Sequence, residues 1–190
     1  MVLCDSEIRA ALRAGHLVIR PEPTANQYTT TAVDLTLGGT FSRWKAPSGH
    51  GATTAIDPAA ADFSFPRIAR DHLQEAPTDE EGAVTLEPGG FLLGITAEWV
   101  ELPVSSHLAA RVEGRSTLAR LGIGIHVTAP TVHSGFRGRI TLEITNHSTL
   151  NIRLCPGLPI CQLIFETVFG TPTEEMTGIF QNQNDVTGRE

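Results

Sequence analysis

Lysine is almost absent from this 190-residue chain, because Lys45 is the only one. The chain has no run of Lys or Arg, and 14 basic residues stand against 21 acidic ones, for a net charge of −7. A duplex-binding protein usually carries a basic face, so no nucleic-acid polymer is expected as a partner. The positive charge is nearly all guanidinium, a group suited to phosphate, so a small phosphorylated ligand remains possible where a few arginines converge.

Long apolar runs and paired cysteines are missing as well. No window approaches the ~18 apolar residues of a membrane span, and the N-terminus lacks the pattern of a secretory signal. Cys4, Cys155 and Cys161 are odd in number and form no CxxC pair, which favours reduced thiols in a cytoplasmic protein. His126 and His133 have no acidic or cysteine neighbour at ligand spacing, so no metal site is expected.

The composition fits one mainly β domain. Eighteen glycines and twelve prolines punctuate the chain, and 41% of it is apolar. Short apolar runs predict strands, and their regular spacing predicts a β-sandwich, jelly roll or distorted barrel. The predicted strands cover residues 17–19, 32–37, 84–86, 91–95, 99–102, 108–112, 123–127, 140–145, 152–154 and 160–165.

Four segments of the chain lie outside this strand pattern. A short helix is expected over 5–15, with Asp5 or Ser6 as its cap and Gly15 closing it. Gly38 and Gly39 predict a turn. Residues 45–82 show no motif and are interpreted as an irregular excursion from a single domain of residues 1–170. Residues 171–190 are polar, and we expect a mobile C-terminal lid that a ligand orders.

The densest group of polar residues follows Gly114. Arg115, Ser116, Thr117 and Arg120 lie within six positions and could surround an anion with guanidinium and hydroxyl donors. A short capped helix with exposed arginines would show the same pattern, so spacing alone leaves both interpretations open.

Glu143 is the best candidate for proton transfer. Strand alternation places it with Thr141 and Thr145 on one face, opposite Ile140, Leu142 and Ile144. The alternative is a carboxylate that simply faces solvent. In a polar cleft, partial burial could instead tune the carboxylate to accept and donate protons.

Seven segments of the chain carry motifs whose order and spacing agree with those of one known family. They are Leu3-Cys4-Asp5, Val33-Asp34-Leu35-Thr36-Leu37-Gly38, Glu113 to Gly122, His126-Val127-Thr128-Ala129, Gly135-Phe136-Arg137-Gly138, Thr141 to Asn146, and Pro156 to Phe165. In combination, these segments resemble the dCTP deaminases of the dUTPase-like superfamily, and the resemblance spans nearly the whole chain outside residues 45–82.

The resemblance implies a fold, an assembly and a reaction. The fold would be a distorted jelly roll or β-barrel of the dUTPase-like type with a short N-terminal helix. Three copies would form a homotrimer with active sites between subunits, each closed by a C-terminal tail. The reaction would be hydrolytic deamination of dCTP to dUTP and ammonia in deoxynucleotide biosynthesis, without a catalytic metal. Mg²⁺ would arrive bound to the triphosphate, and dTTP is the inhibitor to consider.

The resemblance also assigns roles to individual residues. Glu143 would be the general acid and base, while Ser116, Arg120 and the carbonyl of Ala129 would position the attacking water. Arg115 and Thr117 would bind phosphates, assisted by Gln183 from the tail. The full set of implied substrate contacts is Arg115, Thr117, Val127, Thr128, His133, Phe180 and Gln183.

Two departures from the family pattern bear on the products. His133 stands where the family usually has an Asp that contacts the deoxyribose and, in relatives that cleave the triphosphate, helps activate water. The tail has Ile179-Phe180 where a Lys-Tyr pair is usual. We therefore predict a deaminase that releases dUTP intact. The alternatives are a bifunctional dCTP deaminase and dUTP diphosphatase, a dUTPase proper, or a nucleotide-binding regulatory relative with little turnover.

Overall fold

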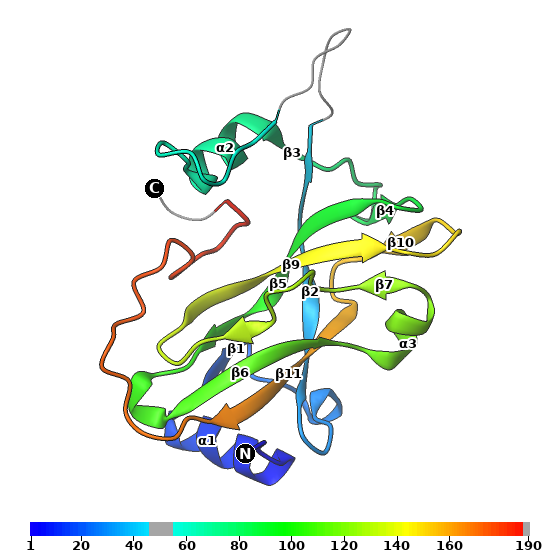
Figure 1. Ribbon diagram of the computed structural model, residues 1–190. Coiled ribbons are helices and arrows are strands. Elements are labelled where there is room, and N and C mark those ends of the chain that lie inside the picture. Colours follow the sequence, from blue (N-terminus) through cyan, green and yellow to red (C-terminus); the bar gives the residue numbers. More distant parts are fainter. Residues whose placement is uncertain (46–54, 188–190) are drawn as a thin grey trace, which may run out of the picture.

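A computed structural model describes residues 1–45 and 55–187. In this part of the chain antiparallel strands make up most of the regular secondary structure, with three short α-helices around them (Figure 1). The helices are α1 (Asp5–Ala14), α2 (Phe65–His72) and α3 (Ser116–Arg120), with 3₁₀ turns at Ala25–Gln27 and Val104–Ser106. The strands are β1 (Val18–Arg20), β2 (Val33–Trp44), β3 (Leu73–Glu75), β4 (Val84–Leu86), β5 (Phe91–Glu101), β6 (Leu108–Gly114), β7 (Ile123–Gly124), β8 (Thr131–Val132), β9 (Arg137–Asn146), β10 (Ile152–Leu154) and β11 (Pro159–Thr167).

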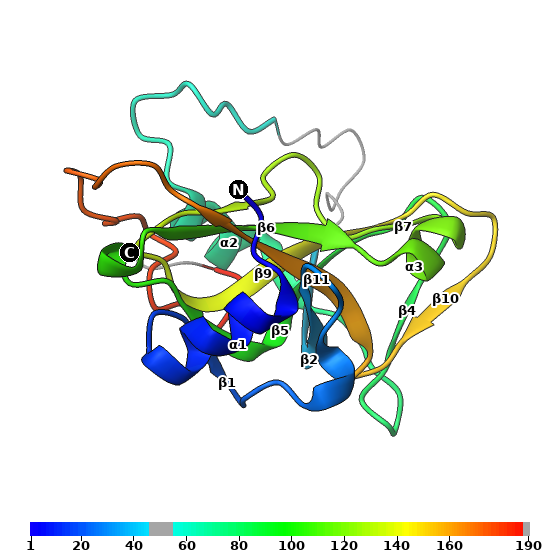
Figure 2. The same ribbon diagram turned by 90° about the horizontal axis from the view of Figure 1, so that it is seen from below.

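The main sheet curls into an incomplete barrel. Its strands run in the order β7-β9-β5-β2-β11-β6-β8, with β1 added on β5 and β3 on β2, while β10 and β4 pair separately. Figure 1 shows α1 at one end of the curled sheet and α2 at the opposite end; Figure 2 looks along the sheet from the α1 end. The prediction of a mainly β, distorted barrel with an N-terminal helix is confirmed. None of the helices in the described residues has the length and apolar character to span a membrane.

The N-terminal helix ends as the sequence predicted. Gly15 adopts the left-handed conformation at φ 72°, and its N–H bonds back to the last turn of α1. Ile8 is fully buried and anchors the helix on the sheet. The predicted cap is wrong, because Cys4 occupies the N-cap position and no side chain there caps the helix.

The predicted turn at Gly38 and Gly39 is also wrong, since both lie inside β2. The register between β2 and β5 shifts between Leu37 and Phe41, so the two glycines sit at an irregularity of the ladder. A Cβ on Gly38 would lie 2.9 Å from the carbonyl oxygen of Ile95. Glycine is therefore needed here for close strand approach and not for a reversal of direction.

Two strands predicted at 91–95 and 99–102 form one long strand, β5, with an irregular centre. The register of β5 with β9 shifts between Ile95 and Trp99, and two polar side chains fill the break. The buried carboxylate of Glu98 accepts hydrogen bonds from the N–H and hydroxyl of Thr36, at 2.9 and 2.8 Å. The hydroxyl of Thr96 accepts one from the N–H of Ile140 at 2.9 Å. Side chains thus replace the ladder bonds that the irregularity removes.

The core lies inside the curl, where the strands contribute alternate residues. Its fully buried large side chains include Phe41, Phe165, Leu17, Leu35, Leu37, Leu92, Leu142, Ile144 and Ile160. Cys161 belongs to this core, and burial raises the pKa of its thiol, which keeps it protonated and unreactive. Cys155 is half-buried near Arg153, and all three cysteines are free.

The region from 45 to 82 contains a helix and a strand that the sequence analysis did not identify. Ser64 caps α2 by accepting from the N–H of Arg67, and Pro66 stands in its first turn. Strand β3 follows directly and pairs antiparallel with the last three residues of β2, Ser42 to Trp44. Residues 46–54 of this region lie outside the described residues.

Replacing Glu98 by Ala tests whether this buried carboxylate holds β5 to β2. The change leaves the half-buried N–H and hydroxyl of Thr36 without their acceptor, so we expect the free energy of unfolding to fall by about 3 kcal/mol. Urea denaturation followed by circular dichroism measures it. Glu81→Ala, whose side chain is 78% exposed and pairs with Arg153 on the surface at 2.7 Å, should cost less than about 1 kcal/mol. Equal losses in both variants would contradict this role for Glu98.

Candidate active site

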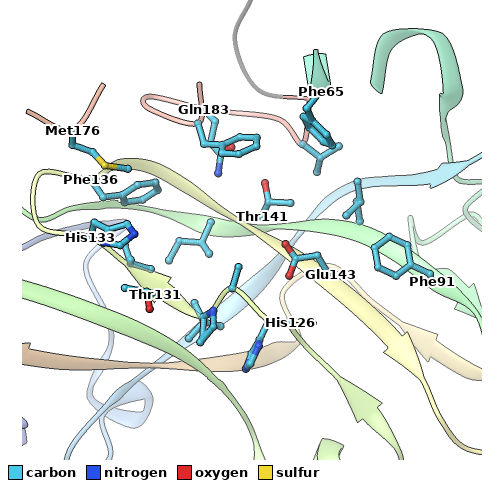
Figure 3. A pocket seen from close by; sticks show the side chains of 18 of the residues that line it. Phe65, Phe91, His126, Thr131, His133, Phe136, Thr141, Glu143, Met176 and Gln183 are labelled. Atoms are coloured by element: carbon cyan, nitrogen blue, oxygen red, sulfur yellow. The ribbon is translucent and has the colours of Figure 1, made fainter. Parts of the chain in front are cut away.

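A cavity of about 540 Å³ lies between β9, the segment around β8, the C-terminal tail and α2 (Figure 3). Most of its wall is apolar, and Glu143 is the one carboxylate among the described residues that line it. The lining residues are Trp44, Phe65, Phe91, Leu93, Val112, His126, Ala129, Pro130, Thr131, Val132, His133, Phe136, Ile140, Thr141, Glu143, Met176, Phe180, Gln183 and Val186.

Strand β9 places Glu143 in this cavity. Leu142 and Ile144, its neighbours on the strand, are fully buried on the opposite face, so Glu143 and Thr141 turn toward the cavity (Figure 3). The predicted alternation of β9 is confirmed. The N–H of Val127 donates to the Oε2 atom of Glu143 at 3.3 Å, which orients the half-buried carboxylate.

The loop between β7 and β8 contributes the residues next to Glu143. Ala129 lines the cavity, whereas the side chains of Val127 and Thr128 are exposed at its edge. His126 also lines it, and its buried Nδ1 has no hydrogen-bond partner among the described residues. This loop therefore supplies both a backbone donor and a backbone segment facing the carboxylate.

The other end of the cavity gathers His133, Phe136, Met176 and Gln183 (Figure 3). His133 lies in the turn before β9, and Gly135 in that turn has φ 90°. Gln183 comes from the tail and is only 7% exposed. Two segments that lie far apart in the sequence thus meet at this end, and the tail forms part of the wall.

Aromatic side chains close the cavity from above. The ring of Phe180, in the tail, packs edge-on against Phe65 of α2 at 5.7 Å between centroids. Phe65 in turn packs edge-on against Trp44 at the end of β2, at 6.5 Å. The sequence analysis missed Phe65 and Trp44. The cap and proline at Ser64 and Pro66 signalled the helix, but nothing in its sequence indicated where it would pack.

The polar group predicted after Gly114, from Arg115 to Arg120, lies apart from this cavity. Arg115 precedes α3, its guanidinium pairs with the buried Asp34 at 3.1 Å, and it donates to the carbonyl of Pro159. Arg120 donates to the carbonyl of Ser116 at 3.3 Å, which keeps it along α3. None of Arg115, Ser116, Thr117 and Arg120 lines the cavity. In Figures 1 and 2, α3 lies at the opposite side of the sheet from the tail.

The predicted site residues therefore fall into two sets within one chain. Glu143, Ala129, His133, Phe180 and Gln183 surround the cavity, and the group on and before α3 forms a separate polar surface. The sequence analysis placed Thr141 beside Glu143 without giving it a role. Its hydroxyl is buried in the cavity wall and has no hydrogen-bond partner among the described residues. In the part of the chain that the structure describes, no three His, Cys, Asp or Glu side chains gather as a metal site.

Known proteins resemble this chain over most of its length. A family model described as dCTP deaminase-like matches residues 2–168. A Coprothermobacter proteolyticus protein named "dCTP deaminase, dUMP-forming" is 41% identical over 170 residues, which cover 89% of this chain and 83% of that protein. A Haloarcula marismortui protein named "dCTP deaminase" is 37% identical over 179 residues, covering 94% and 86%.

One solved structure supports the fold assignment. The crystal structure of 2′-deoxycytidine 5′-triphosphate deaminase from Agrobacterium tumefaciens superimposes with a TM-score of 0.63 at 22% identity, over 87% of this chain and 48% of that one. This chain thus spans about half the length of that solved chain and shares its fold. Together with the family match and the relatives near 40% identity, the curled sheet and its cavity establish that the chain belongs to the dCTP deaminase-like family.

Proposed function

We propose that this protein converts dCTP and water to dUTP and ammonia, with Glu143 as the general acid and base. The observation that carries the proposal is the position of Glu143, the one carboxylate among the described lining residues, held by a backbone N–H in a mostly apolar cavity. A pyrimidine ring can pack against such walls, and a carboxylate beside it can move protons without a metal.

The chemistry needs one group that both takes and gives protons. Glu143 removes a proton from water, and the resulting hydroxide adds to C4 of the cytosine ring. The π electrons of the N3=C4 double bond move to N3, and the ring stays intact. Glu143 returns the proton to N3. It then takes the remaining water proton from the hydroxyl on C4 and carries it to the exocyclic 4-amino nitrogen. The bond between C4 and that nitrogen breaks, which releases ammonia and leaves a carbonyl at C4. The carbonyl of Ala129, at the cavity wall, can hold the attacking water.

We propose that the missing half of the site comes from a neighbouring copy, within a homotrimer. The support is the separation described above, because one chain does not bring Ser116 and Arg120 to Glu143. A triphosphate also needs cations, and no Arg or Lys occurs among the described residues that line the cavity. Two exposed apolar side chains support this: Val127 beside the cavity is 56% exposed, and Leu121 at the end of α3 is 50% exposed. A second copy would cover this apolar surface.

In this assembly, the neighbour's Arg115 and Thr117 bind phosphates, and its Ser116 and Arg120 stabilise charge at C4. Val127 and Thr128 border the base, while His133, Phe180 and Gln183 contact the nucleotide from the other end. The tail from 171 onward acts as the lid. Mg²⁺ comes with the triphosphate, whose charge it partly neutralises. Phosphate oxygens and water suit it as ligands, since residues 1–45 and 55–187 hold no cluster of carboxylates that could bind a metal.

The relatives' names supply a second candidate product. The Coprothermobacter protein is named as dUMP-forming and the Haloarcula protein as a deaminase only. Forming dUMP requires a water to attack phosphorus, and His133 at the cavity wall is no carboxylate acceptor for such a water. We therefore favour release of intact dUTP.

Glu143→Gln tests the general base. The amide keeps the size of the side chain and can still accept from Val127, but it cannot take a proton. We expect ammonia release from dCTP to fall by about 10²–10⁴-fold while the folded structure is kept. Glu166→Gln, on β11 and paired with the half-exposed Arg111, serves as the matched control and should keep native activity. Near-native turnover by Glu143→Gln would remove this residue from the mechanism.

Mixing two inactive variants tests whether sites form between copies. Glu143→Gln and Arg120→Ala each disable one half of the proposed site. If equal amounts co-assemble at random into trimers, about one quarter of the sites receive both intact halves. Ammonia release should then recover to about a quarter of the native rate, with trimer mass checked by light scattering. Two halves in the same chain would give no recovery at any mixing ratio.

The products distinguish the two candidate reactions. Ammonia and pyrophosphate are measured separately after incubation with dCTP and then with dUTP. We expect ammonia from dCTP and no pyrophosphate from either nucleotide. His133→Asp introduces a carboxylate at the cavity wall, and His133→Ala is its control for loss of the ring. Pyrophosphate release by the native protein would favour the dUMP-forming reaction.

A further inference from the structure

Asp34 carries a buried carboxylate that the proposed reaction does not use. It lies in β2, and its side chain is only 8% exposed. Its Oδ2 atom pairs with Nη2 of Arg115 at 3.1 Å, and its Oδ1 atom accepts a hydrogen bond from Nε2 of Gln162 at 3.0 Å. Both carboxylate oxygens thus have a partner, as a buried charge requires. The three side chains form a connected row from Gln162 through Asp34 to Arg115.

The sheet brings these residues together from three strands. Strand β11 lies between β2 and β6, and Gln162 of β11 stands directly opposite Asp34 of β2. Arg115 follows the last residue of β6, so its side chain crosses β11 to reach the carboxylate. Its Nη1 atom also donates to the carbonyl of Pro159, the first residue of β11, at 3.2 Å. A guanidinium held at two of its nitrogens has a fixed orientation and little rotamer freedom.

The guanidinium of Arg115 keeps donors for a ligand. It carries five N–H groups in a planar fork, and its contacts with Asp34 and Pro159 occupy only part of them. The side chain is 36% exposed, so solvent and ligands can reach it. Arg115 directly precedes α3, and it therefore adjoins Thr117, whose hydroxyl the proposed function also assigns to the phosphates.

The charge of Asp34 by itself works against nucleotide binding. A carboxylate next to a phosphate-binding arginine weakens the attraction of that arginine for a polyanion. A buried ion pair also adds little net stability, because the lost hydration of both charges offsets their attraction. What the carboxylate does provide is geometry, since an arginine that is already ordered loses less conformational entropy when a ligand binds.

We propose that Asp34 is a positioning residue, which holds the guanidinium of Arg115 across β11 in the orientation that binds the phosphates of the nucleotide. Gln162 fixes the carboxylate in turn. The inference deepens the proposed function, on which it rests, by assigning the preorganisation of the phosphate site to a buried carboxylate on β2. In the proposed homotrimer, this carboxylate serves the cavity of the neighbouring copy.

Asp34→Ala tests this role through separate values of kcat and KM for ammonia release from dCTP. Without the carboxylate, Arg115 has to be ordered at each binding event. We therefore expect KM to rise by about five- to tenfold, the scale of ordering one long side chain. The value of kcat should stay within about twofold, because Ser116 and Arg120, the groups proposed to act at C4, keep their places on α3.

Further variants separate positioning from a structural role. In an Arg115→Ala background there is no guanidinium to hold, so adding Asp34→Ala should leave KM unchanged or, by removing a negative charge, lower it. Gln162→Met keeps the ion pair and should raise KM by a smaller factor than Asp34→Ala does. Asp62→Ala removes a surface carboxylate that is 78% exposed, and this control should keep both native constants.

The outcomes that would overturn the inference are distinct. They are a native KM in Asp34→Ala, a loss confined to kcat, or the same rise in KM with and without Arg115. Circular dichroism checks folding, and if Asp34→Ala does not fold, a native KM in Gln162→Met overturns the inference instead. A native protein that releases no ammonia from dCTP would overturn the proposed function, and this inference with it.

Discussion

The pairing of β5 with β9 is the constraint on which the candidate site depends. Leu93 lies opposite Glu143 and Ile95 opposite Thr141, so the register of these two strands decides what faces the cavity. Leu142 and Ile144 are fully buried on the other face, and a slip of one residue would exchange them with Glu143. That exchange would place a carboxylate in the core and leave the cavity without one. The hydrophobic core therefore specifies the position of the proposed catalytic group, without any interaction dedicated to it.

The same strand also has to curl, and two polar side chains make this possible. A regular ladder along β5 would give a more uniform surface, whereas the break between Ile95 and Trp99 bends the strand. Glu98 and Thr96 satisfy the backbone and hydroxyl groups that the break leaves free on β2 and β9. Because Thr96 bonds to Ile140, next to Thr141, the repair lies at the edge of the cavity. The irregularity that appeared in the sequence only as a gap between two predicted strands is thus what shapes the site.

How much could be predicted from the sequence follows from the range of each interaction. Gly15 and the alternation of β9 are local signals, and both were predicted. Gly38 illustrates the opposite case, because its close neighbour is Ile95, more than fifty residues away, and a glycine pair alone resembles a turn. The packing of Phe65 on Phe180 joins α2 to the C-terminal tail, and no repeating pattern in the sequence links these two segments. The proposed division of the site between copies is still harder to predict, since no pattern within one chain records which surface of a second copy it will meet.

The neutrality of the cavity's end near Gln183 is consistent with the charge of the whole molecule. The chain carries −7 and the proposed ligand is a polyanion, so every added carboxylate near the phosphates raises the cost of binding. Gln183 and His133 line that end and offer hydrogen-bonding groups without a formal negative charge, and the amide of Gln183 is held by its bond to the carbonyl of Arg139. Glu143 is the exception, and the proposed proton transfer requires its carboxylate. A single carboxylate, placed along β9 away from Gln183, reconciles the proposed acid–base chemistry with binding of an anionic nucleotide.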